Sequence, residues 1–355
     1  MKNLFRTLSI AGLICFVQLS GVNPAEPRDG SHDFDFNFGV WHTHIVRVVK
    51  PLTASHATAV EDGTVTVRKI WGGKASLEEI EADGAAGHWE GMTIFLYNPA
   101  AHRWSQTYIG AKDGTYSPGD IGAFENGRGE FASTDSVDGK PVRVRGVWSD
   151  VTPTSHRYHI MYSGDAGAHW QTVFDAHLTR IAERAPDEGA AVPSTGAHHE
   201  FDFDFGTWDA HSQRLQHPLS GANDWVTLDG TTVVHKIWGG RANYAEVALQ
   251  GAHAPPQILA LRWYSPATKR WNLDFANARD GTLGIPGTGT FRNGRIDFVD
   301  REPYQGRPIE VRFSVWNAGP DRARSEEAFS GDGKAWETTW KTEYTRRAKS
   351  TATNG

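Results

Sequence analysis

Most of this chain consists of short stretches in which apolar and polar residues alternate, which is the period of a β-strand with one face in water. Residues 142–145 (Val-Arg-Val-Arg) and 309–312 (Ile-Glu-Val-Arg) show the pattern clearly. Asn-Gly lies between such stretches at 126–127 and again at 293–294, and this dipeptide favours a tight hairpin because both turn residues need positive φ. Closely spaced turns leave no room for crossover helices, so we predict an all-β antiparallel meander. Its simplest closure is an up-and-down β-barrel, which has no unpaired edge.

The whole pattern occurs twice. The segment 32–41 returns as 199–208, and Lys-Ile-Trp-Gly-Gly at 69–73 returns at 236–240, each 167 residues later. A constant offset over so long a span indicates a duplicated domain, because solenoid repeats have periods of roughly 20–50 residues. We therefore predict two tandem barrels, each large enough to bury its own core. The predicted order is a signal peptide (1–25), a first barrel (26–180), a linker (181–197), a second barrel (198–347) and a disordered tail (348–355).

The N-terminus predicts export. Lys2 and Arg6 precede an apolar stretch at 8–19, which is typical of a bacterial signal peptide and too short to span a bilayer. The only cysteine, Cys15, lies in this stretch, so the mature protein would have no thiol. We expect a secreted or periplasmic location.

Several classes of partner are disfavoured by the composition. The net charge is −6 and the basic residues are scattered, unlike the basic stripe of a nucleic-acid-binding protein. No later run is long and apolar enough for membrane insertion. The chain has neither a P-loop nor a dinucleotide fingerprint, and no histidine cluster has the spacing of a structural zinc site. We therefore predict no cofactor and no metal, and the sequence leaves the oligomeric state open.

Two further motifs carry a resemblance to known families. Gly-x-Trp opens each copy at 39–41 and 206–208, and Thr-Arg closes each copy at 179–180 and 345–346. This combination resembles the lipocalins and the wider calycin superfamily. The resemblance implies that the first-strand Trp packs at the closed end of the barrel and that the last-strand Arg lies across it, which suits a guanidinium plane on an indole face.

Each copy is also similar to the DUF1579 domain, a lipocalin-like bacterial family. The similar elements are the Phe-Asp-Phe start, Lys-x-Trp-Gly-Gly, Tyr-x-Pro-Ala-x-x-Arg-Trp at 97–104 and 264–271, and the closing Ser-Gly-Asp…Trp…Thr-Arg. The resemblance covers nearly all of each repeat. It implies a fold and supplies no catalytic residues.

Alternation along the first strand of each copy suggests which residues face the interior. About eight strands would leave room for one small ligand. Counting in twos from Trp41 and from Trp208 places Arg47 and Arg214 inward. A buried Arg needs an anionic or carbonyl partner, and Glu79 and Glu246 are the candidates present in both copies. Such a pair would orient a polar ligand head, or it would be a structural ion pair, or the Arg would lie at the rim in water.

The tryptophans divide into two groups. Those that match between the copies, including Trp148 with Trp316 after a small gap, are predicted to be core. Unmatched tryptophans are better ligand contacts, because an aromatic face inside a cavity suits a flat or apolar ligand or a sugar. These candidates are Trp89, Trp225, Trp263 and Trp340.

The second copy carries charged residues at three positions where the first copy has a different residue. Arg262 replaces Phe95, Asp274 replaces Thr107 and Glu326 replaces His159. If one barrel is the working one, we therefore expect it to be the second. Ordinary drift at solvent-facing positions would explain the same changes.

Three functions remain open at this stage. The first is binding of a small hydrophobic or amphipathic molecule in a barrel cavity. The second is a cofactor-independent isomerase, cyclase, hydratase or hydrolase acting on a hydrophobic or glycosidic substrate, with Arg214 and Glu246 near Glu326 or Asp274 as acid or base. The third is a structural or interaction module with solid barrels and a functional inter-barrel face bearing His44 and His211. The count places these two matched residues outward, where they would form an inter-barrel contact or be surface histidines.

Overall fold

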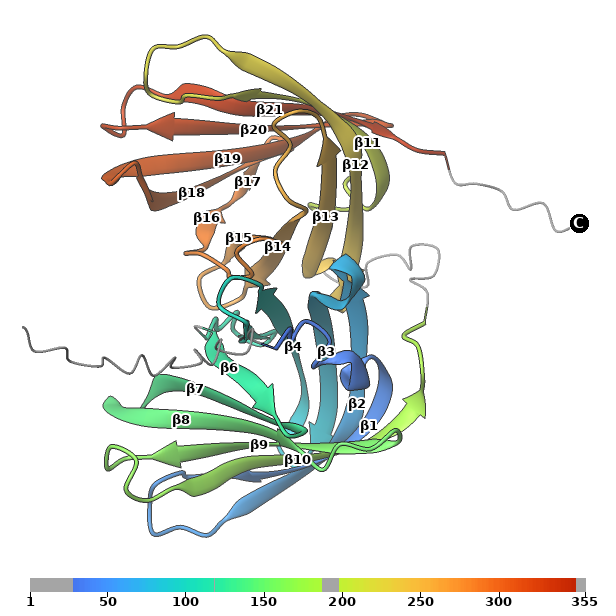
Figure 1. Ribbon diagram of the computed structural model, residues 1–355, viewed down its shortest axis with the longest axis vertical. Helices are drawn as coiled ribbons and strands as arrows, with labels where there is room; N and C mark the ends of the chain where they lie inside the picture. The colour runs from blue at the N-terminus through green and yellow to red at the C-terminus, as the bar shows by residue number, and fades with distance from the viewer. Residues whose placement is uncertain (1–27, 118, 187–197, 349–355) are drawn as a thin grey trace, which may run out of the picture.

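The computed structural model describes residues 28–117, 119–186 and 198–348. The predicted signal peptide lies outside the described residues, as do most of the predicted linker and tail. The described chain forms two antiparallel β-barrels in tandem, stacked one above the other with the first, coloured blue to green, below (Figure 1). The all-β, two-barrel prediction is therefore confirmed. Within the described residues, no helix has the length and apolar character needed to cross a membrane.

The first barrel is a closed ring. Each strand pairs with the strand that precedes or follows it in the sequence, and the pairing of β1 with β10 closes the ring. This is the predicted meander, with ten strands rather than about eight. Its strands are β1 (Gly39–Val48), β2 (Thr58–Ile70), β3 (Ala75–Gly84), β4 (Gly87–Asn98), β5 (Arg103–Gly110), β6 (Asp120–Glu125), β7 (Arg128–Val137), β8 (Lys140–Ser149), β9 (Ser155–Ser163) and β10 (Gln171–Ala182).

The second barrel repeats this order, with the counterpart of β6 divided into two short strands. Closure comes from the pairing of β16 with β18 at Thr288 and Val299. Its strands are β11 (Gly206–Leu215), β12 (Trp225–Ile237), β13 (Ala242–Gln250), β14 (Ile258–Ser265), β15 (Arg270–Asn277), β16 (Gly287–Gly289), β17 (Phe291–Arg292), β18 (Arg295–Tyr304), β19 (Arg307–Gly319), β20 (Arg322–Ser330) and β21 (Glu337–Arg346).

Both barrels are closed at one end by the same Trp–Arg arrangement. The Arg180 guanidinium lies 3.9 Å from the centre of the Trp41 ring, and the Arg346 guanidinium lies 4.0 Å from that of Trp208. Arg346 also donates to the carbonyl oxygens of Phe203 and Phe205, each at 2.6 Å. The geometry implied by the Gly-x-Trp and Thr-Arg motifs is confirmed in both copies.

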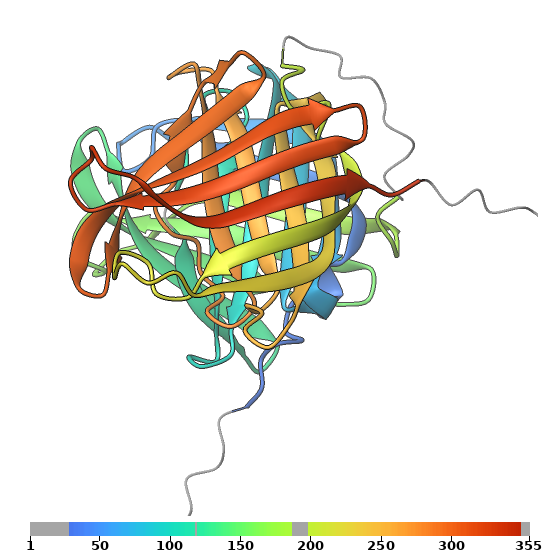
Figure 2. The same cartoon turned by 90° about the horizontal axis from the view of Figure 1, so that it is seen from above.

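The two barrels share a core between them. Apolar residues on the outer faces of β2–β5 pack against the outer faces of β12–β15. In the view along the axis that joins the barrels, the second barrel lies over the first (Figure 2). The predicted inter-barrel role of His44 and His211 is wrong. Both histidines are exposed, bond to Asp62 and Asp229 on the adjacent strands, and take no part in the shared core.

Strand register corrects one of the matched tryptophans. Trp148 lies opposite Tyr158, whereas Val315 lies opposite the equivalent Ser325. The counterpart of Trp148 is therefore Val315, and Trp316 lies one position further along, on the opposite face of its strand. The 167-residue offset holds here without a gap, so the sequence match of Trp148 with Trp316 was wrong.

A cavity in the second barrel as the candidate functional site

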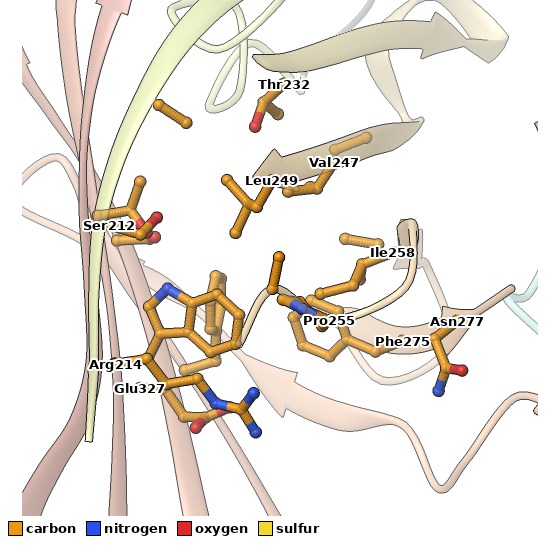
Figure 3. Close-up of a pocket in the computed structure, with 18 of the residues that line it drawn as sticks. Ser212, Arg214, Thr232, Val247, Leu249, Pro255, Ile258, Phe275, Asn277 and Glu327 are labelled. Atoms are coloured by element: carbon orange, nitrogen blue, oxygen red, sulfur yellow. The ribbon is translucent and has the colours of Figure 1, made fainter. Parts of the chain in front are cut away.

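The second barrel encloses a cavity of about 680 Å³, a size typical of small-molecule sites. Figure 3 shows apolar side chains, among them Val247, Leu249 and Ile258, on one side of the cavity, and Arg214 and Glu327 on the other. Trp208, Ala210, Ser212 and Arg214 all line it, so alternation along the first strand identified the inward face. Further lining residues are Val226, Thr232, Val234, Ala245, Ala260, Arg262, Leu273, Phe275, Phe313, Val315, Ser325, Trp340, Thr342 and Tyr344.

The first barrel shows why the second one is hollow. In the first, Trp148 and Tyr158 stack at 4.4 Å between ring centres and both bond to Gln106 in the interior. Val315 and Ser325 occupy the equivalent positions in the second barrel and line its cavity. Because ring systems are replaced by small side chains on adjacent strands, the barrel wall is retained while its interior is emptied.

The mouth of the cavity opens where a hairpin is shortened. In the first barrel, β3 and β4 remain paired up to the turn, and Ala82 lies opposite Trp89. The pairing of β13 with β14 ends at Val247 and Ile258. Pro255 and Pro256 follow in the intervening loop and line the mouth. Since proline cannot donate to a ladder, this loop peels away from the sheet, and proline also takes the place of Trp89.

The polar groups at the mouth come from several strands. Arg214, exposed at the rim, has its guanidinium 5.1 Å from the centre of the Trp340 ring. Glu327 accepts a hydrogen bond from the Thr339 hydroxyl at 2.8 Å. Burial raises the pKa of Glu327 above its ordinary value, and Arg214 opposes this effect. Burial also raises the pKa of Glu302 on the same wall, so both carboxyls are harder to ionise than they would be in water.

Asp300 lies on the same strand as Glu302, and burial together with neighbouring carboxylates raises its pKa to about 7. The mouth therefore combines a guanidinium with carboxyl groups that burial makes reluctant to ionise.

The floor of the cavity contains a buried ion pair. Arg262 donates to Asp204 at 2.7 Å, and their side chains are 5% and 9% exposed. Arg262 also lies over the Phe201 ring, 4.3 Å from its centre. Asn37 and Phe95 occupy the equivalent positions in the first barrel, so both charges are specific to the second. A buried pair of this kind is costly to break, which fixes Arg262 in place.

The first barrel fills its own mouth. Arg47 forms an ion pair with Glu61, whose side chain is 3% exposed, and the Trp89 indole nitrogen donates to Glu61 at 2.9 Å. The predicted Arg47–Glu79 pair is therefore wrong, because Glu79 faces outward and pairs with Arg68. Deeper in, buried Glu78 accepts a long bond of 3.4 Å from Asn37, and burial raises its pKa to about 7.

The predicted Arg214–Glu246 pair is also wrong. Glu246 lies on the outer face of β13, between the inward residues Ala245 and Val247, and pairs with His235 at 3.3 Å. Glu326 likewise faces outward, next to inward Glu327, and accepts a bond from Thr338. Trp225 lies outside the barrel with the Lys341 amine 5.0 Å from its ring centre.

Two further candidates belong to the inter-barrel contact. Trp263 is 1% exposed within the shared core, and its indole nitrogen donates to the Gly114 carbonyl at 3.3 Å. Asp274 accepts hydrogen bonds from the backbone nitrogens of Phe275 and Gly284 and from the Tyr116 hydroxyl. Burial raises the pKa of Asp274 to about 6. The structure therefore does not bring Glu246, Glu326 and Asp274 together with Arg214.

Of the residues proposed from the sequence, the cavity brings together Arg214, Arg262 and Trp340. Sequence reasoning missed Glu327 and Glu302 because their facing depends on bulges and cross-strand register. It also missed Asp204 and Glu61, although each differs from its counterpart in the other copy, Asn37 and Leu228. Unmatched charges at otherwise apolar positions were the available signal. The described ranges contain no group of three or more His, Cys, Asp or Glu residues suited to a metal ion.

Comparison with known proteins adds little beyond this geometry. No family model matches the chain, and a search of the curated proteins found no match. The resemblance to DUF1579 therefore stays a prediction. The class of the protein rests on its own strand order, which is that of two tandem, closed, lipocalin-like barrels.

Three solved structures are similar to the chain, each with a low sequence identity and a low TM-score. A DUF3598-family protein of unknown function from Nostoc punctiforme is 11% identical over 90% of this chain and 100% of that chain, with a TM-score of 0.28. The S-type phycobiliprotein lyase of Guillardia theta is 11% identical over 42% of this chain and 90% of that chain, with a TM-score of 0.28. A transferrin-binding protein B mutant from Haemophilus parasuis is 8% identical over 87% of this chain and 76% of that chain, with a TM-score of 0.21. These likenesses carry no argument about function.

Proposed function

We propose that this protein binds a small amphipathic molecule non-covalently in the cavity of its second barrel. The observation that carries the proposal is the contrast between the two copies of one domain. The same fold is filled by Trp148, Tyr158 and Glu61 in the first copy and is hollow in the second. Since large-to-small changes in a core cost stability unless something compensates, the opened interior of the second copy favours a role for that space.

The lining supports an amphipathic ligand rather than a purely apolar one. One wall is aliphatic and aromatic, with Val247, Leu249 and Phe275, and would take a hydrocarbon body. The mouth, with Arg214 and Glu327, offers charged or hydrogen-bonding groups to a polar head. Export to the periplasm or beyond, predicted from the N-terminal leader, would make the protein a carrier or scavenger outside the cytoplasm.

An enzymatic role has less support. The acid–base set proposed from the sequence is dispersed over the outer face and the inter-barrel contact, so it cannot act on one substrate. The carboxyls that do face the cavity, Glu302 and Glu327, do not belong to that set. Binding therefore requires fewer assumptions than catalysis.

Native mass spectrometry of the mature protein, with and without added decanol, tests the proposal. We expect one retained small molecule per chain, either co-purified or decanol, which is lost on denaturation. The matched variant Ser325→Tyr gives the second barrel the ring that Tyr158 supplies in the first, and it should lose the adduct while remaining folded. A bare chain in both conditions would contradict the proposal, as would an adduct that survives the substitution unchanged.

A further inference from the structure

One chemical difference between the two mouths is the carboxylate that pairs with the arginine of the first barrel. In the first barrel, the Glu61 carboxylate lies inside the wall, held by Arg47 and by the Trp89 indole nitrogen. The second barrel retains the arginine as Arg214, but Leu228 stands where Glu61 would be. The first barrel thus contains, as part of its own chain, a carboxylate on an aliphatic stem seated at its arginine.

We infer that the second barrel takes from solution what the first supplies itself: an amphiphile with an anionic head, whose carboxylate or equivalent anion is held by Arg214. This inference rests on the proposed function, and it names the class of ligand. The apolar body would lie along Val247, Leu249 and Ile258, opposite the arginine (Figure 3).

The other cations of the cavity are already neutralised. Arg262 at the floor is paired with Asp204, and Arg279 at the mouth is paired with Asp280 at 2.9 Å. Arg214 instead lies against the Trp340 ring at the rim, where water and ligand can reach its guanidinium. An aromatic face holds the side chain in position without neutralising its charge.

The acidic groups of the mouth are the main objection to an anionic ligand. Glu302 and Glu327 line the same cavity, and Asp300 lies beside Glu302 on β18. Burial raises the pKa of all three, which favours neutral carboxyl groups. A protonated carboxyl donates a hydrogen bond to an anion, whereas an ionised one repels it. A cationic ligand would instead require these groups to ionise, and the Arg214 guanidinium would repel it.

Three probes of equal chain length separate the possibilities: decanoate, decanol and decylamine, each titrated calorimetrically into the protein that contains both barrels. We expect decanoate to bind about tenfold or more tightly than decanol, because a hydrogen-bonded ion pair adds to the same apolar contact. Arg214→Met, which retains an apolar stem, should abolish this preference without weakening decanol. Arg312→Met is the matched control, since Arg312 lies 4.5 Å from the centre of the Trp336 ring on the outer face of the same barrel.

A reciprocal variant tests the comparison between the barrels. Leu228→Glu restores the carboxylate of the first barrel, and it should pair with Arg214 and exclude decanoate. Thermal unfolding of each variant shows whether its barrel remains folded, and Arg214→Met alone is sufficient to test the inference if Leu228→Glu unfolds. Tighter binding of decylamine than of decanoate would overturn the inference. Equal binding of decanol and decanoate would also overturn the inference, but it would still support the cavity as a binding site. Failure of all three probes to bind would overturn the proposed function as well.

Discussion

Glu78 offers a quantitative test of how the first barrel is packed. Glu78 is 5% exposed inside the barrel, and its carboxyl group accepts a long bond of 3.4 Å from Asn37. Burial raises its pKa from 4.5 to about 7. The folded state therefore holds this proton more tightly than the unfolded chain, and stability is lost as the pH rises from about 4.5 through about 7. At about 1.4 kcal/mol per pKa unit, the loss above neutral pH is about 3 kcal/mol.

Replacing Glu78 by Gln removes this ionisation while retaining shape and an acceptor. We expect Glu78→Gln to be more stable than the wild type by up to about 3 kcal/mol at about pH 8, and nearly equal to it below about pH 4.5. Urea unfolding followed by tryptophan fluorescence at both values measures the difference. Glu81→Gln, exposed on the other face of the same strand, controls for the loss of one charge. A difference that does not change with pH, or a wild type that is the more stable at high pH, would refute the reasoning.

Three further predictions concern the packing of the fold. Arg346→Met should destabilise the second barrel by about 3 kcal/mol in urea unfolding, because the carbonyls of Phe203 and Phe205 lose a charged donor. Arg347 is exposed, so Arg347→Met should have a much smaller effect. Equal effects of the two substitutions would show that the Trp–Arg closure is unimportant. Trp263→Ala should cost about 3–5 kcal/mol and separate the unfolding of the two barrels in calorimetry, whereas Trp225→Ala on the outer face should leave one transition; a single transition in both would contradict the shared core. Tyr158→Ser should destabilise the first barrel by about 3 kcal/mol and allow decanol to bind there, and unchanged stability would indicate that this interior is not filled as described.

Much of the architecture could be predicted because it depends on local signals repeated twice. Turn dipeptides and alternation determine the meander, and the spacing of Gly-x-Trp and Thr-Arg determines the closed end. Alternation within β11 placed Arg214 correctly. The same count could not place Glu246, because the facing of one strand relative to the next depends on cross-strand register, which a single strand does not contain.

Other errors have a different physical origin. Trp263 lies on the outer face of its barrel, where a sequence read one barrel at a time predicts contact with water or ligand. A second copy of the same fold covers that face. The cavity itself could have been predicted from the paired sequence, since Val315 and Ser325 replace Trp148 and Tyr158 at the constant offset. A match of Trp148 with Trp316 departs from this offset by one residue and hides the exchange.

The most direct test of the central claim is to follow the indole signals of the tryptophans by nuclear magnetic resonance while decanol is titrated into the protein. If the second barrel is the binding barrel, Trp208 and Trp340, which line its cavity, should shift saturably. Trp89 and Trp148 in the filled first barrel should stay unchanged. Saturable shifts in the first barrel with none in the second, or no saturable shift in either, would contradict the account.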